Sequence, residues 1–63
     1  MSSIAIIEYQ TSGGNWQRVC DCSNRPAVIK SIMDSIFQSN PNYQKLRALD
    51  AQTKQMLDMA IRA

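Results

Sequence analysis

Both glycines of the chain stand side by side in the segment TSGGN, residues 11–15. Glycine adopts positive φ without steric cost, so the pair marks a tight turn. The segment before the turn, SIAIIEYQ (residues 3–10), is rich in β-forming side chains, and the segment after it, WQRVCDC (residues 16–22), alternates as a strand does. Together these features predict a β-hairpin over residues 3–22.

Two loop lengths are compatible with this turn. A three-residue loop sets Glu8 opposite Arg18 and Ile7 opposite Val19, whereas a two-residue loop sets Glu8 opposite Val19 and Ile7 opposite Cys20. We favour the three-residue loop because it pairs opposite charges and also pairs two β-branched side chains.

A helix is predicted over residues 26–38. Its start is indicated by SNRP, because Ser23 or Asn24 can cap a helix and proline is tolerated in the first turn. Pro41 disfavours helical backbone at the residue before it and so marks the end. Between these limits the apolar residues recur with the spacing of one buried helical face. They are Val28, Ile29, Ile32, Met33, Ile36 and Phe37.

The segment RALDAQTKQMLD, residues 47–58, is compatible with a helix or with a second hairpin. Its composition favours a helix, but residues 50–55 include no large apolar side chain, which interrupts any helical stripe. Asp50 can form an Asx turn, and Lys54 occupies a position where hairpin turns commonly carry glycine. We therefore favour a hairpin over residues 44–61 and keep the helix as the alternative.

The strands of this second hairpin can also be assigned to faces. Alternation places Leu46 and Ala48 on one side of the first strand, and Leu57, Met59 and Ile61 on one side of the second. We expect Met33, Met56 and Met59 to fill the core, with a place at an interface as the alternative.

The predicted fold class is α+β: a single ββαββ domain of 63 residues with one helix packed on a four-stranded antiparallel sheet. The alternative is a β-hairpin followed by two helices. A chain of this length buries only about 60% of the surface that its unfolded form exposes, so its stability is modest.

The first strand is apolar on both sides, and one helix covers only one face of a sheet. The uncovered face then exposes hydrophobic side chains, a feature that usually marks a partner surface. We expect a protein partner or a second copy (a homodimer) to bind there. The predicted interaction surface comprises Ile4, Ile6, Trp16, Arg18 and Cys20.

The alternative partner is a nucleic acid, contacted by basic and aromatic residues on the sheet. The basic candidates are Arg18, Lys45, Arg47 and Lys54. The formal net charge is only +2 and the basic residues are scattered, so we favour the protein-interaction module.

The sequence predicts no enzyme, cofactor or metal site. It contains no histidine, the residue most often used as general base and metal ligand. Cys20 and Cys22 would share one side of a strand, and we interpret them as small half-buried residues. A redox pair, or a metal site completed by a second subunit, are the alternatives.

The sequence also lacks a membrane-spanning segment. No apolar run approaches the roughly 20 residues that a helix needs to cross a bilayer. The N-terminal segment has no basic region ahead of its short apolar stretch, so no signal peptide is predicted. We expect a cytoplasmic protein.

Overall fold

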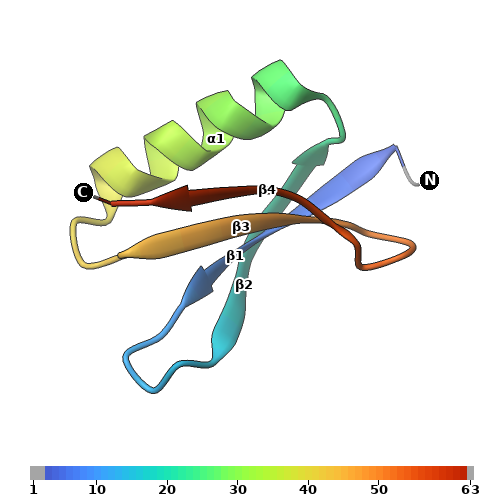
Figure 1. Ribbon diagram of the computed structural model, residues 1–63. Coiled ribbons are helices and arrows are strands. Elements are labelled where there is room, and N and C mark those ends of the chain that lie inside the picture. The colour runs from blue at the N-terminus through green and yellow to red at the C-terminus, as the bar shows by residue number, and fades with distance from the viewer. Residues whose placement is uncertain (1–2, 63) are drawn as a thin grey trace.

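The computed structural model describes residues 3–62, and these form a two-layer α+β fold (Figure 1). One helix lies across one face of a four-stranded antiparallel sheet. The elements in chain order are β1 (Ile4–Gln10), β2 (Trp16–Ser23), α1 (Pro26–Ser39), β3 (Lys45–Asp50) and β4 (Met56–Ile61). The predicted ββαββ fold is confirmed, and the version with two helices is wrong.

The strands are ordered β2-β1-β3-β4 across the sheet, and every pairing is antiparallel. Each hairpin supplies one central strand and one edge strand. The strands β1 and β3 therefore form the middle of the sheet, whereas β2 and β4 each have one neighbour in the described part of the chain.

The turn between β1 and β2 has the predicted three-residue loop. The N–H of Thr11 donates to the Asn15 carbonyl over 2.7 Å, and this bond encloses residues 12–14. Within the loop the N–H of Gly14 donates to the Thr11 carbonyl over 2.9 Å, and Gly14 has a φ of 88°. Glu8 lies opposite Arg18, as predicted. Val19 then forms a bulge, so Ile7 pairs with Cys20 and its predicted pairing with Val19 is wrong.

The helix begins at Pro26, as predicted, and extends one residue beyond the expected end. The predicted capping by Ser23 or Asn24 is wrong, because Arg25 is the N-cap residue and no side chain caps the helix. The Asn24 amide instead donates to the Asp50 carboxylate over 3.3 Å. It thus links the start of the helix to the end of β3.

The turn between β3 and β4 confirms the predicted chemistry. The carboxylate of Asp50 accepts the backbone N–H groups of Gln52 and Thr53 over 2.9 and 3.0 Å. Lys54 has a φ of 65°, in the left-handed region where glycine was expected. Asp50 is only 1% exposed, so the turn is anchored in the interior of the domain.

The core lies between the helix and the two central strands. Its buried cluster consists of Ala5, Ile7, Ile29, Met33, Leu46 and Ala48. Among residues 3–62, no helix has the length and apolar character that a membrane span requires.

A bulge at Leu57 changes which side chains of β4 share a face of the sheet. Ala48 pairs with Asp58 whereas Leu49 pairs with Met56, so Leu57 is the extra residue. Leu57 packs against the core, and the prediction that it shares a face with Met59 is therefore wrong.

The methionines divide between the two sides of the sheet. Met33 is buried, as predicted. Met56 and Met59 are 52% and 40% exposed, so their predicted place in the core is wrong.

Candidate protein-interaction surface

The surface of the sheet that faces away from α1, here called the open face, is built from cross-strand rows of side chains. One row crosses all the strands in the order Asp21, Ile6, Leu49 and Met56. Leu49 at its centre is only 8% exposed. This row therefore forms an apolar strip with one acidic end on β2.

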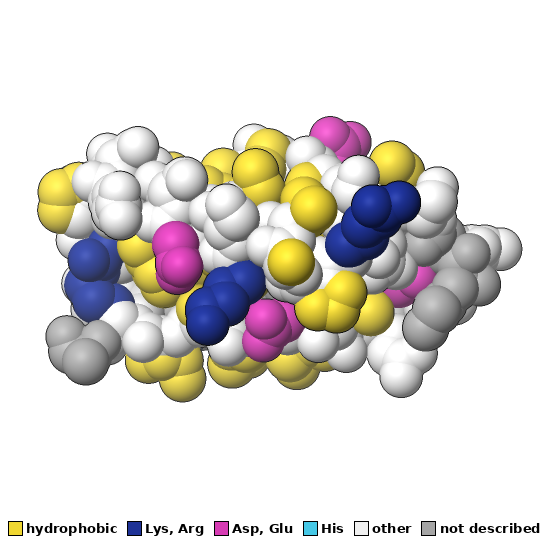
Figure 2. All heavy atoms as spheres, turned by 90° about the horizontal axis from the view of Figure 1, so that it is seen from above, with side chains coloured by type: hydrophobic (Ala, Val, Ile, Leu, Met, Phe, Trp, Pro, Cys, Tyr) yellow, Lys and Arg dark blue, Asp and Glu magenta, His cyan; other side chains and the backbone are white. Residues whose placement is uncertain are grey.

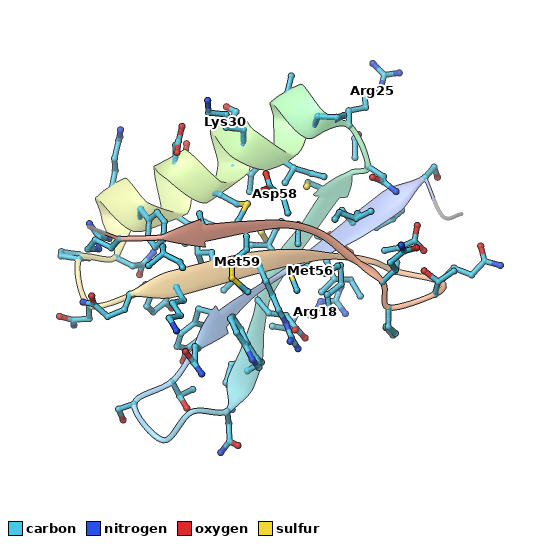
Figure 3. The ribbon with its side chains drawn as sticks, in the orientation of Figure 1. Arg18, Arg25, Lys30, Met56, Asp58 and Met59 are labelled. Atoms are coloured by element: carbon cyan, nitrogen blue, oxygen red, sulfur yellow. The ribbon has the colours of Figure 1, made fainter. Side chains whose placement is uncertain are left out.

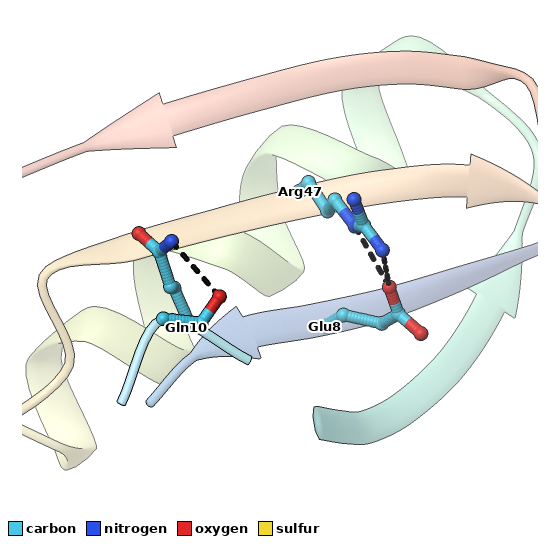
Figure 4. A network of polar contacts seen from close by, with 4 residues as sticks. Glu8, Gln10 and Arg47 are labelled. Atoms are coloured by element: carbon cyan, nitrogen blue, oxygen red, sulfur yellow. Dashed lines mark hydrogen bonds and ion pairs between the residues drawn. The ribbon is translucent and has the colours of Figure 1, made fainter. Parts of the chain in front are cut away.

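The next row carries charged groups, in the order Arg18, Glu8, Arg47 and Met59. The Nε and Nη2 atoms of Arg47 both lie 2.7 Å from Oε1 of Glu8 (Figure 4). Its guanidinium carbon also lies 4.2 Å from the centroid of the Trp16 ring. Arg47 thus holds Trp16 and Glu8 in place across the first three strands, as cation–π and ion pairs do.

A second ion pair lies within β2. Nη2 of Arg18 is 2.8 Å from Oδ2 of Asp21, and both side chains are more than half exposed. Exposed pairs of this kind contribute little to stability because water competes for both partners. This pair places one positive and one negative group at the margin of the open face.

The opposite margin of the open face, on β4, is apolar. Met56, Met59 and Ile61 are all exposed there, Ile61 by 63%. We call these three residues the apolar margin. Figure 3 shows that Met56 and Met59 lie on the side of the sheet away from α1, as does Arg18. Ile4 on β1 adds a further large hydrophobic side chain that is 41% exposed.

The helix layer presents a different surface. Seen from above, over α1, basic and acidic side chains are interspersed with hydrophobic and uncharged ones (Figure 2). Lys30 and Arg25 point away from the sheet (Figure 3). The helix layer is therefore a mixed polar and apolar surface.

Cys20 does not belong to the open face, which corrects one predicted member of the interaction surface. The bulge at Val19 pairs Cys20 with the buried Ile7, and both Cys20 and Cys22 pack against the core. Burial raises the pKa of each thiol above its usual value of 9.0. The two residues thus occupy the half-buried positions that the sequence predicts.

The other predicted members of the interaction surface, Ile4, Ile6, Trp16 and Arg18, lie together on the open face. The sequence reasoning missed the apolar margin on β4. Simple alternation grouped Leu57 with Met59, and only the bulge separates them. Nothing in the sequence marks this bulge clearly.

The candidate nucleic-acid contacts are not brought together as a group. Arg18, Arg47 and Lys45 lie on the open face, whereas Lys54 is in the turn between β3 and β4. Because Arg18 and Arg47 are each paired with a carboxylate, the positive potential of this face is reduced.

Comparison with models of protein families, with curated proteins and with solved structures found no match for this chain.

Proposed function

We propose that this chain is a non-enzymatic protein-interaction module that forms a homodimer through the open face of its sheet. The observation that carries the proposal is the apolar margin. Met56, Met59 and Ile61 are exposed next to one another on a face that α1 does not cover. Contiguous exposed hydrophobic side chains usually mark an interaction site in a small protein.

The charges of the open face favour a second copy as the partner. Each exposed or half-exposed arginine is matched by a carboxylate on the same face, Arg47 by Glu8 and Arg18 by Asp21. Two of the three basic side chains on this face, those of Arg18 and Arg47, are thus paired, which lowers the repulsion between two copies. In a twofold interface the same patch serves both partners, so a surface that carries both signs can be complementary to itself.

The size of the chain supports association as well. Chains of 63 residues have small cores, and association is one of the ways in which they gain stability. The proposal places the protein in a reducing, cytoplasmic environment, which the free thiols of Cys20 and Cys22 favour.

A nucleic-acid-binding function is less well supported. It would require Arg18 and Arg47 to exchange their carboxylate partners for phosphates. It would also leave the apolar margin without a role.

The experiment that tests the proposal is sedimentation equilibrium of the full chain over a wide range of concentrations. We expect a monomer–dimer equilibrium. Met56→Asp should weaken it by about tenfold or more, because the substitution places a charge in the apolar margin. Ser31→Asp on the exposed side of α1 is the matched control and should leave the equilibrium unchanged.

A wild-type chain that remains monomeric at millimolar concentration would contradict the proposal, as would a Met56→Asp variant that dimerises normally. A salt-dependent shift of DNA or RNA in a gel, abolished by Arg18→Ala, would favour the nucleic-acid alternative.

A further inference from the structure

The outer edge of β4 carries backbone groups that are positioned to pair with another strand. The N–H of Arg62 donates to the Gln44 carbonyl over 2.8 Å, one position beyond the pairing of Ile61 with Lys45. In an antiparallel ladder the hydrogen-bonded pairs alternate. The backbone N–H and C=O groups of Ile61 and Met59 therefore point away from β3, toward the outside of the sheet.

The side chain of Asp58 accepts a hydrogen bond from one of these outward-pointing N–H groups. The N–H of Met59 donates to Oδ1 of Asp58 over 2.8 Å. Figure 3 shows the side chains of Asp58 and Met59 on opposite sides of the sheet, with Asp58 on the side of α1. The Asp58 carboxylate thus reaches from its own side to the strand edge and satisfies the donor there.

The rest of β4 favours strand pairing. Its sequence, MLDMAI, contains one charged residue and neither proline nor glycine. Apolar edge strands of this kind tend to add a strand from another chain unless a charge or a bulge prevents it. The bulge of β4, at Leu57, lies before the residues that would pair, Met59 to Ile61. The other edge, β2, is longer and carries both Arg18 and Asp21 beside its bulge.

We propose that the edge of β4 can pair with β4 of a second copy, and that the Asp58 carboxylate opposes this pairing by accepting the Met59 N–H. Antiparallel pairing about a twofold axis at Ala60 sets Met59 opposite Ile61 of the second copy. Both residues point their backbone groups outward, so they can exchange hydrogen bonds on each side of the axis.

The pairing also fits the side chains. It keeps the open-face residues Met59 and Ile61 on a common face and places the small Ala60 side chains at the axis. The Met59 N–H cannot donate fully to the Asp58 carboxylate and to the Ile61 carbonyl of the second copy at the same time. The edge pairs through backbone groups of β4, whereas the proposed dimer uses the side chains of the open face, so the inference does not depend on the function proposed above.

Three variants test the role of Asp58 by sedimentation, each combined with Met56→Asp to suppress association through the open face. Asp58→Ala removes the acceptor and should tighten self-association by about tenfold, the equivalent of about one backbone hydrogen bond. Asp58→Asn keeps an acceptor oxygen and should behave as its parent. Asp34→Ala on α1 removes the same charge at a distance and should also have no effect.

Backbone amide exchange of the Met56→Asp parent at low concentration provides a second readout. The Met59 amide should exchange more slowly than that of Ile61, and Asp58→Ala should abolish this difference. Unchanged self-association of Asp58→Ala would overturn the proposal, and so would equal exchange of both amides in the parent. Association of Asp58→Asn to the same degree as Asp58→Ala would overturn the assigned role of the acceptor oxygen.

Discussion

The backbone N–H of Lys54 donates to the carbonyl of Asp50 over 2.8 Å, and this bond closes the turn between β3 and β4. Lys54 adopts a φ of 65° to make it. Any residue with a side chain is disfavoured in this left-handed region, where glycine is not. The turn is therefore fixed by Asp50 at its start and strained at Lys54.

Lys54→Gly should stabilise the protein by about 1 kcal/mol, because glycine removes the strain of the left-handed conformation. Urea unfolding followed by the fluorescence of Trp16 measures this change. Lys30→Gly is the control, since it introduces glycine within α1 and should cost about 1 kcal/mol instead. A lower urea midpoint for Lys54→Gly would contradict the turn geometry.

Asp50→Ala should be strongly destabilising, by about 2–3 kcal/mol, because two backbone N–H groups lose their acceptor beside a buried position. Asn24→Ala removes the amide contact to Asp50 and leaves those acceptors in place, so it should cost less, about 1 kcal/mol. The same unfolding experiment compares the two variants. Equal losses would show that the turn donors do not depend on Asp50.

Arg62 joins the end of β4 to the end of the helix. Its Nε donates to the Tyr43 carbonyl over 2.8 Å and its Nη2 to the Phe37 carbonyl over 2.7 Å. Its guanidinium carbon also lies 4.7 Å from the centroid of the Phe37 ring. The charge therefore sits where the helix C-terminus is negative.

Arg62→Ala should lower the free energy of unfolding by about 1–3 kcal/mol, and Arg62→Lys should lose an intermediate amount, because one ammonium group cannot reproduce both bonds. Thermal unfolding by circular dichroism ranks the three proteins. A lysine variant as stable as the wild type would mean that charge alone, rather than the geometry of the guanidinium, is required.

The two free thiols predict a loss of stability at high pH. Burial raises the pKa of Cys20 and Cys22 above the usual value of 9.0, so the folded state binds their protons more tightly than the unfolded state. Their contribution is therefore complete below pH 9 and lost as the pH rises through the folded pKa values. Urea unfolding between pH 7 and about pH 10 should show the decline, and a variant with alanine at both positions should show less of it.

Local signals in the sequence predict most of the fold. The paired glycines mark the first turn, and the charges of Glu8 and Arg18 select its loop length. Asp50 marks the second turn, although lysine stands at position 54 where glycine is expected. The spacing of apolar residues predicts the helix to within one residue of its end. These features follow from interactions between residues close in sequence, which is why local reasoning finds them.

The candidate surface is harder to predict because it depends on the two bulges. The bulge at Val19 turns Cys20 toward the core, and the bulge at Leu57 leaves Met56 and Met59 on the open face. A bulge shifts every later side chain to the other face, and its position depends on packing across the sheet. Strict alternation therefore assigns the right strands but misplaces several side chains.

Double-mutant cycles should separate the two ion pairs of the open face. The pair Glu8–Arg47 is about one-fifth to one-quarter exposed and is stacked on Trp16, so water competes weakly for it. Its coupling energy should be about 1 kcal/mol, from alanine substitutions made singly and together. The pair Arg18–Asp21 is more than half exposed and should couple by less than about 0.5 kcal/mol.

Raising the salt concentration to 1 M provides the accompanying check, because it should reduce the Arg18–Asp21 coupling further and leave most of the Glu8–Arg47 coupling in place. Equal couplings for the two pairs would contradict the assignment of Arg47 as the residue that holds the open face together. A Trp16→Ala variant should in turn weaken the Glu8–Arg47 coupling, since the ring excludes water from one face of the guanidinium.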